Sequence, residues 1–340
     1  MSAGAPSVSV IIPMYNAEKM IERCLAPLLS MLGAGEIVEI IVVDDGSTDD
    51  SAAIVRAHAA LQLLAMEVQG GPGAARNRAA QIARGEYLWF IDSDVIVADN
   101  AARVLRETLS RIRPAAVIGL YDDRPGATNF LSQYKNLVHH YYHYRGKDQS
   151  STFWAGCGAA QRSLFLQLGG FDARRYRYPS IEDIELGYRI VDAGGVIVLE
   201  RRLRAKHLKE WRFVNLVHTE VFRRALPWSR LMLERKNITD DLNVARGERL
   251  RAALTGAVVL SAVAWAAGWL STWLFVGLIA TLITANAGFI AFFAQTRGPL
   301  FAVRAFLFHQ LYYLYSSATF AAVLAGTYLR RPDKAARGAD

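Results

Sequence analysis

The last third of the 340-residue chain is almost free of charge, and this constrains the fold more than any other feature. Residues 252–329 contain only two charged side chains, Arg297 and Arg304. Within them, 252–270 and 273–294 carry no charge, and each is long enough to cross a hydrocarbon layer of ~30 Å as a helix. A soluble protein would need a very large core to cover such a helical hairpin, so we expect two membrane spans.

A third apolar stretch, residues 306–329, is a weaker candidate because His309 and Gln310 lie near its start. We expect it to be a third span, with an interfacial or re-entrant helix as the alternative. The choice decides where the basic tail, residues 330–340, would lie. Three spans would place this tail on the far side of the membrane, against the positive-inside rule. Two spans and an interfacial helix would keep it on the near side.

The basic excess of the chain lies close to these apolar stretches. A net charge of +8 and a pI near 9.5 would suit either a nucleic acid or an anionic membrane surface. However, residues 1–200 are net −4, residues 201–251 are net +8 and residues 252–340 are net +4. The distribution therefore argues against a nucleic-acid partner and favours an anionic membrane surface.

Residues 211–251 form a basic juxtamembrane segment ahead of the first apolar stretch. Within it, residues 213–235 alternate apolar and basic side chains, and Pro227 divides them into two short pieces. Basic amphipathic helices with Trp, Phe and Leu are typical of a membrane surface, and ordinary packing on a folded domain is the alternative. The start, MSAGAPSVSVIIP, lacks the features of a signal peptide. We therefore expect an integral membrane protein whose first 200 residues stay on the cytoplasmic side.

The first 200 residues alternate short strand-like runs with helical patterns. Strands that alternate with helices form βαβ units around a mainly parallel sheet. We therefore expect an α/β domain whose ligands bind beyond the carboxyl ends of the strands. The expected strands are Val8–Pro13, Val38–Val43, Leu63–Val68 and Tyr87–Ile91, and helices are expected from Ala17, over 50–60 and over 74–84.

Three of the expected strand ends carry polar side chains. Asn16 follows the first strand, Asp44 and Asp45 follow the second, and Asp92 and Asp94 follow the fourth. Two carboxylates at positions i and i+2 of a turn can face a divalent cation, its waters and phosphate oxygens. A solvated turn or a helix cap is the alternative for this DSD triplet. The Asp44–Asp45 pair can accept hydrogen bonds from ribose hydroxyls or a base N–H group, or can cap the following helix.

A glycine turn with an arginine opens the expected third helix. The run GPGAARN at 71–77 is neither GxGxxG nor a P-loop, which weighs against a dinucleotide oxidoreductase and a P-loop NTPase. Arg76 could reach a pyrophosphate, and a surface arginine is the alternative. The two cysteines, Cys24 and Cys157, are too few for a disulfide scaffold or a four-cysteine zinc site.

Six short motifs follow one another along residues 7–210: PMYN (13–16), VVDDGSTDDS (42–51), GPGAARN (71–77), FIDSD (90–94), GGFD (169–172) and EDIELGYRI (182–190). In this order they resemble the family 2 glycosyltransferases with the GT-A fold. The resemblance implies a GT-A domain over residues 1–210 with a Rossmann-like, mainly parallel sheet. It also implies a nucleotide-sugar donor, most often UDP-linked, and a Mg²⁺ or Mn²⁺ ion that bridges the donor diphosphate.

The same resemblance assigns roles to single residues. Asp94 would be the direct metal ligand, Asp92 would lie nearer the ribose and sugar within the metal set, and His207 would complete the metal shell. Asp183 would take the proton from the acceptor hydroxyl in an inverting transfer, and Glu182 would help to bind acceptor or donor. Acidity that favours a helix N-terminus is the alternative for this pair. Nucleotide-sugar contacts would come from Pro13, Tyr15, Asn16, Asp44, Asp45, Arg76, Asp92 and Ser93.

The segment between the donor motifs and the EDIELGYRI motif is rich in aromatic residues and histidine. For residues 134–144 we favour a helix with an aromatic face against the core over a surface that binds sugar or lipid headgroups. The run FWAGCG at 153–158 resembles the family's glycine stretch ahead of the acceptor site. Trp154 and Gly156 are therefore candidate acceptor contacts, and Trp211 is a third.

The residues after the last motif bear on how many sugars are added. Processive members of the family carry QxxRW, whereas residues 207–211 of this chain read HLKEW. The departure favours one sugar per acceptor. We therefore expect a membrane-anchored inverting glycosyltransferase with a lipid acceptor, either a polyprenyl phosphate or a glycolipid. A polysaccharide synthase subunit and a non-catalytic nucleotide-sugar-binding adaptor are the alternatives, and the oligomeric state is left open.

Overall fold

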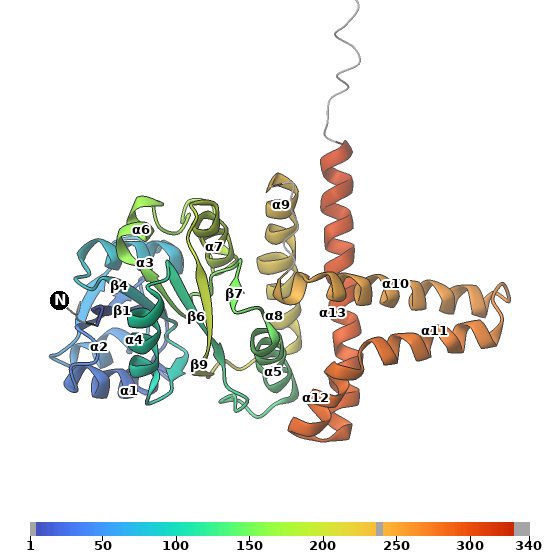
Figure 1. The fold of residues 1–340 in the computed structure, drawn as a ribbon, viewed down its shortest axis with the longest axis horizontal. Helices are drawn as coiled ribbons and strands as arrows, with labels where there is room; N and C mark the ends of the chain where they lie inside the picture. Colours follow the sequence, from blue (N-terminus) through green and yellow to red (C-terminus); the bar gives the residue numbers. More distant parts are fainter. Residues whose placement is uncertain (1–4, 236–240, 330–340) are drawn as a thin grey trace, which may run out of the picture. The chain divides into compact units, whose positions relative to one another are not determined.

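The computed structural model describes residues 5–235 and 241–329, which belong to two units, Met1–Phe213 and Val214–Asp340 (Figure 1). The division between the units lies close to the expected end of the catalytic domain at residue 210. The expected basic tail, residues 330–340, lies outside the described residues.

The first unit is built on one mixed sheet. Its strands follow the order β3-β2-β1-β4-β8-β6-β9-β5, and β7 pairs with β9. β1 is parallel to β2 and β4, and β2 is parallel to β3, as the βαβ pattern predicts. β8 is antiparallel to its neighbours β4 and β6, so the second half of the sheet is mixed. The strands are β1 (Val8–Met14), β2 (Glu39–Asp44), β3 (Gln62–Ala65), β4 (Tyr87–Ile91), β5 (Val95–Val97), β6 (Ala116–Tyr121), β7 (Gln149–Ser150), β8 (Cys157–Gln161) and β9 (Ile197–His207).

Helices cover both faces of this sheet, which explains why every residue of β1, β2 and β4 is buried. One core cluster joins Val10 and Trp89 to α1, α2 and α4. The other joins Ile11 and Phe90 to α3, α6 and α7. Successive residues of a strand therefore serve opposite cores. The helices are α1 (Ile21–Gly33), α2 (Ser51–Arg56), α3 (Gly71–Ile82), α4 (Ala101–Ile112), α6 (Arg162–Gln167) and α7 (Glu182–Asp192).

The aromatic segment forms helix α5 (Phe130–Arg145), which packs against β6 and β9. Tyr134, Leu137 and Tyr141 are all buried, so the predicted helix with an aromatic face against the core is confirmed. The helix begins with a side-chain cap, because Asn129 accepts a hydrogen bond from the backbone N–H of Ser132 at 3.0 Å.

The second unit is helical. Its first elements are α8 (Phe213–His218), the π-helical turn η1 (Thr219–Ala225) and α9 (Leu226–Arg235), which follow one another without a break. The expectation that Pro227 would split this segment is wrong. Proline lacks the N–H of a normal helical bond, and the widened π-turn directly before it accommodates the ring without ending the helix.

The apolar third forms four helices, α10 (Arg246–Ala266), α11 (Thr272–Ala285), α12 (Ala287–Arg297) and α13 (Pro299–Leu329), after the short turn η2 (Leu242–Val244). Among the described residues, α10 alone is a single helix long and apolar enough to cross a membrane. The stretch 273–294, expected as one helix, is broken at Asn286 into α11 and α12. These two helices differ in direction by 59° and satisfy the same criterion only as a pair.

One close approach in the first unit fixes the position of α7. A Cβ atom on Gly187 would lie 2.2 Å from the backbone nitrogen of Phe153, so only glycine lets the helix lie this near the 152–156 segment. A Cβ atom on Gly33, in α1, would have no atom within 4 Å.

We predict that Gly187→Ala lowers the free energy of unfolding by about 1–3 kcal/mol, because the methyl group has no room beside Phe153. Gly33→Ala is the matched control and should be neutral or stabilising by up to about 1 kcal/mol, since alanine restricts the unfolded chain. Thermal unfolding of the two full-length variants in detergent measures the difference. Equal effects would show that the close approach is not rigid.

Candidate active site

The loops after β1 and β2 hold each other through Asn16. This residue has a φ of 49°, its backbone N–H donates to Ser47 Oγ at 3.0 Å, and its side-chain oxygen accepts from the Thr48 N–H at 2.8 Å. Asp44 accepts from the Ser47 N–H at 2.9 Å in the same loop. Tyr15, by contrast, is 49% exposed. The PMYN and DDGST motifs therefore form one connected surface at the carboxyl ends of β1 and β2.

Asp45 fixes the start of α3. Its two carboxylate oxygens accept from the N–H groups of Gly70 and Gly71, both at 2.8 Å. Gly71 has a φ of +83°, and a Cβ there would lie 2.0 Å from the carbonyl oxygen of Arg177. The carboxylate expected in the nucleotide pocket thus positions the helix that carries Arg76.

Arg76 is 3% exposed and lies between two carboxylates from different motifs. Its Nη2 donates to Asp92 Oδ1 at 2.5 Å, and its Nη1 lies 3.4 Å from Glu182 Oε1. The guanidinium also stands over the ring of Phe171, 5.3 Å from the ring centre. The arginine is therefore a buried link between the DSD and ED motifs, and not a surface residue.

The carboxyl groups around Arg76 differ in the direction in which the site shifts their pKa values. Burial, together with the charge of Asp183, raises the pKa of Glu182 to about 7, although Arg76 acts in the other direction. Partial burial likewise raises the pKa of Asp92, with Arg76 opposing and Asp94 reinforcing the shift. Partial burial also disfavours the charged form of Asp94, but His207 and Lys209 outweigh it and lower the pKa. Asp94 is therefore the more firmly ionised member of the DSD pair.

Asp94 and His207 face each other at the end of β9. His207 Nε2 lies 3.4 Å from Asp94 Oδ2, and the pairing of Val95 with His207 between β5 and β9 keeps the two together. The ring of Tyr121 stacks on His207 with centres 4.6 Å apart and planes 15° apart. Within the described residues, no three His, Cys, Asp or Glu side chains gather closely enough to hold a metal ion on their own.

Asp183 reaches the segment that carries the candidate acceptor contacts. Its Oδ2 accepts from the Ala155 N–H at 3.2 Å, and the carbonyl oxygen of Gly156 accepts from the Asp92 N–H at 3.4 Å. Trp154 packs against Tyr121, with ring centres 4.7 Å apart. The structure therefore brings the ED pair, the DSD pair and the 154–156 segment together.

Trp211 lies apart from this group. It is 4% exposed, its backbone N–H donates to Ser132 Oγ on α5 at 2.7 Å, and the ammonium of Lys209 stands over its ring at 4.4 Å. The tryptophan packs into the interior of the first unit, where it anchors the chain after β9. Nothing in these contacts presents its ring to an acceptor.

The sequence analysis assigns no role to two further residues that shape the site, Asn77 and Arg189. Asn77 holds the GGFD loop through two bonds of 2.8 Å, one to the carbonyl oxygen and one from the N–H of Phe171. Arg189 donates to the carbonyl oxygens of Leu168 and Gly170 from the other side. The one sequence feature that points to Asn77 is its position directly after Arg76 in the GPGAARN motif.

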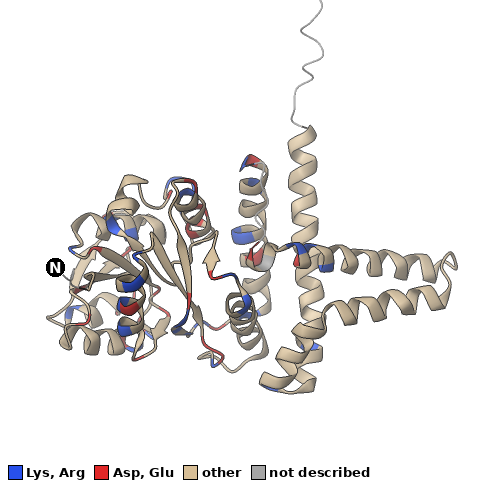
Figure 2. Cartoon of the chain, viewed as in Figure 1, with Lys and Arg blue, Asp and Glu red and all other residues tan. Residues whose placement is uncertain are grey.

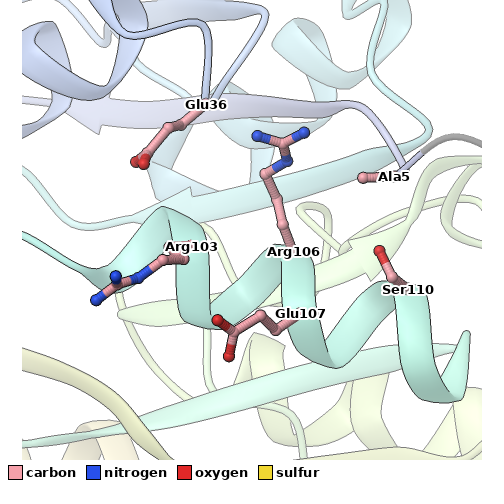
Figure 3. A pocket seen from close by; sticks show the side chains of 6 residues that line it. All are labelled: Ala5, Glu36, Arg103, Arg106, Glu107 and Ser110. Carbon is pink, nitrogen blue, oxygen red and sulfur yellow. The ribbon is translucent and has the colours of Figure 1, made fainter.

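A separate hollow of about 340 Å³ lies elsewhere on the first unit (Figure 3). Helix α4 supplies most of its lining, with Arg106 among the labelled side chains, and Glu36 faces it from the loop before β2. It contains none of the predicted site residues, and its arginine and glutamate charges are mixed, so it gives no support to a second ligand site.

Residues 9–169 match the model of "Glycosyl transferase family 2". This segment belongs to that family. A glycosyltransferase from Streptococcus pneumoniae, GlyG, is 36% identical over 118 residues, covering 34% of this chain and 38% of the relative. A poly(ribitol-phosphate) beta-glucosyltransferase from Bacillus spizizenii is 40% identical over 99 residues, covering 28% of this chain and 16% of the relative. The chain thus spans well under half the length of these relatives.

The family 2 domain has the GT-A fold, and a solved structure shares the fold over most of the chain. The mannosyltransferase PcManGT from Pyrobaculum calidifontis, determined with GDP-Man and Mn²⁺, gives a TM-score of 0.60 at 21% identity. The alignment covers 93% of this chain and 87% of that one. The similarity in fold therefore extends beyond the first unit.

We predict that Glu182→Gln changes how stability depends on pH. Since the pKa is raised to about 7, folded Glu182 keeps its proton where the unfolded chain has lost it. The free energy of unfolding of the unmodified chain should therefore fall as pH rises from about 4.5 to 7. Glutamine has no such proton, so the variant should gain at least about 1 kcal/mol relative to the unmodified chain across this range.

Glu200→Gln serves as the control in the same unfolding experiment. Burial opposes the charged form of Glu200, but hydrogen bonds from Arg202 and Thr108 outweigh it and lower its pKa to about 2. The stability that the ionised Glu200 contributes is lost only as pH falls from about 4.5 toward 2. The free energy of unfolding of its variant should therefore follow the same pH dependence as that of the unmodified chain between about pH 5 and 7.5. A parallel course for Glu182→Gln as well would contradict the raised pKa.

Proposed function

We propose that this chain is an inverting glycosyltransferase that moves a sugar from a nucleotide-sugar to a lipid acceptor at a membrane. We expect the donor to be UDP-linked. The observation that carries the proposal is the buried Arg76, which joins Asp92 of the donor motif to Glu182 beside the candidate base Asp183. A donor and an acceptor hydroxyl that meet here would have a cation, carboxylates and a base within one site.

In the proposed reaction the acceptor oxygen bonds to the anomeric carbon while the bond from that carbon to the diphosphate oxygen breaks. The acceptor proton passes to Asp183, and the leaving nucleoside diphosphate takes the electron pair. The Ala155 N–H bond to Asp183 Oδ2 orients the carboxylate toward the 154–156 segment. Arg76 is suited to the developing phosphate charge because its guanidinium is already fixed and largely dehydrated.

The residues present fit a divalent metal ion. Two ligand atoms bound at about 2.1 Å with an angle of 90–110° between them lie about 3.0–3.4 Å apart, as Asp94 Oδ2 and His207 Nε2 do at 3.4 Å. A carboxylate oxygen and an imidazole nitrogen suit Mn²⁺, with Mg²⁺ as the alternative. Such an ion would neutralise the diphosphate charge. Asp92 is held by Arg76 in this arrangement and is better placed toward the sugar or ribose.

The distribution of side chains in the second unit supports anchorage in a membrane. Its exterior is apolar, with Leu260 at 73% exposure and Trp273 at 85% exposure. Its interior holds polar groups, among them Glu248, Asn286 and His309 at 8%, 1% and 0% exposure. A protein in water reverses this pattern, whereas lipid favours apolar surfaces and buried polar groups. The basic segment 211–251 would then meet anionic headgroups on the cytoplasmic side.

We predict that the purified chain in lipid vesicles transfers label from a radiolabelled nucleotide-sugar into material extractable with organic solvent. UDP- and GDP-linked donors should be compared, and the extracted product should carry one sugar. Asp183→Asn should retain donor binding but lose transfer by at least about 100-fold, because no base remains for the acceptor proton.

Asp192→Asn, at the other end of α7, is the control and should leave transfer unchanged. Label that enters only water-soluble or polymeric material would contradict the lipid acceptor. Full transfer by Asp183→Asn would remove the base from the mechanism. Donor binding without transfer to any acceptor by the unmodified chain would favour a nucleotide-sugar-binding adaptor.

We predict that His207→Ala weakens Mn²⁺ binding by about tenfold or more, measured by calorimetry with nucleoside diphosphate present, because one ligand atom is lost. His58→Ala is the matched control, since His58 Nε2 also lies 3.0 Å from a carboxylate, Glu22, but at the surface. Mn²⁺ affinity should be unchanged in this control. An equal loss in both variants, or in neither, would contradict the assignment of His207.

A further inference from the structure

A polar cluster joins the base of α10 to the middle of α13. Tyr313 donates to Glu248 Oε2 at 2.6 Å, and Thr255 donates to Gln310 Oε1 at 2.8 Å. Arg251 pairs with Glu248 in the same cluster. We call these five residues the base cluster. All come from the first turns of α10 or from a single turn of α13.

The spacing of these bonds shows how the two helices meet. The bonds span residues 248–255 of α10, about 10 Å of helix, but only residues 310–313 of α13, about 4.5 Å. Helices that ran side by side would use equal lengths, so α13 crosses α10 (Figure 1). The crossing lies near the midpoint of the 31-residue α13. The two helices therefore cannot both follow the bilayer normal.

The length of the α10–α11 hairpin and the residues at its two ends are typical of an element that is inserted into a membrane. Arg246, Arg249 and Arg251 lie at its base, and its remaining length is free of charge (Figure 2). Trp269 and Trp273 lie at its tip, 84% and 85% exposed. Helix α10, from Arg246 to Ala266, has a rise of about 30 Å, equal to the hydrocarbon thickness. Arginine at one end and tryptophan at the other are typical of helices that span a bilayer.

The break at Asn286 is stabilised from within the unit. Arg251 Nε donates to the Ala285 carbonyl oxygen at 2.8 Å, and Asn286 Nδ2 donates to the Leu282 carbonyl oxygen at 2.9 Å. Backbone groups freed at a helix break must be satisfied in lipid by protein atoms. The same arginine thus belongs to the base cluster and to the point where α11 turns into α12, so the two lie at one depth.

Helix α13 has the surface of an interfacial element. Leu300, Val303, Leu307 and Leu311 are 74%, 53%, 60% and 38% exposed, and their spacing puts them on one side of the helix, together with the exposed Arg304. His309 and Tyr313 are buried on the other side. η1 and α9, which belong to the amphipathic segment expected at the membrane surface, pack against α13. These elements therefore form one layer, which the hairpin crosses.

We propose that the α10–α11 hairpin is the membrane-spanning element of the described residues and that α13 lies in the cytoplasmic interface, with its leucine stripe toward the hydrocarbon. The proposal rests on the proposed membrane anchorage and replaces the third span expected at 306–329. Residue 329 then lies on the same side of the membrane as the first unit, in agreement with the positive-inside rule.

Labelling of single introduced cysteines tests this arrangement. Cys24 and Cys157 are both fully buried, so the native thiols give little background. Ser110→Cys on α4 marks the side of the first unit, Ser271→Cys marks the hairpin tip, and Thr327→Cys marks the end of α13. The full-length variants are reconstituted in vesicles and treated with a membrane-impermeant maleimide, added outside or enclosed inside.

Thr327→Cys should be labelled from the same side as Ser110→Cys, and Ser271→Cys only from the opposite side. Labelling of Thr327→Cys only from the side of Ser271→Cys would overturn the proposal in favour of a third span. Labelling of all three from one side would show that the hairpin does not cross. Release of the unmodified chain from vesicles by alkaline carbonate is a different result, because it would refute the membrane anchorage itself.

Discussion

The buried guanidinium of Arg76 is the interaction on which the site depends. It lies between Asp92 and Glu182, which follow it in the sequence by 16 and 106 residues. Removing one partner of a buried ion pair typically costs about 3–5 kcal/mol, because the other charge is left uncompensated. The distance between the donor motif and the ED motif is therefore set by a strong constraint. Loss of Arg76 would leave two carboxylates close together in a poorly solvated place.

The position of Arg76 depends in turn on Asp45, which bonds the start of the helix that carries the arginine. Both oxygens of Asp45 bind N–H groups at the start of α3, and Arg76 lies one and a half turns into that helix. The carboxylate after β2 thus determines where the guanidinium after β3 can reach. Glycine at position 71 is required because its φ is +83° and another chain segment occupies the place of a side chain. The loops after β1, β2 and β3 are therefore joined by hydrogen bonds into one unit beside the proposed donor site.

The sequence predicts the strands β1, β2 and β4 and the residues at their ends well, because burial on both faces and a polar strand end are local patterns. It does not predict the stacking of Tyr121 on His207, since this contact depends on the parallel pairing of β6 with β9, which residues 122–196 separate in the chain. It also does not predict that Asp45 bonds the N–H groups of Gly70 and Gly71, 25 and 26 residues further along the chain. The break at Asn286 is not predicted from the average hydrophobicity of residues 273–294, because it coincides with a single polar side chain that bonds its own helix.

In the proposed membrane arrangement of the second unit, a few polar bonds determine the depth of a helix in lipid. Apolar side chains on α13 would be accommodated equally well along the bilayer normal or in the interface, so hydrophobicity alone does not select its direction. Tyr313 and Gln310 decide it, because their partners Glu248 and Thr255 lie at the base of α10 and cannot follow α13 into the hydrocarbon. Separating either pair would leave a buried polar group without a partner in a medium that offers no replacement. In this proposal the direction of α13 is therefore determined by hydrogen bonds, and its apolar stripe would only add to the affinity for the membrane.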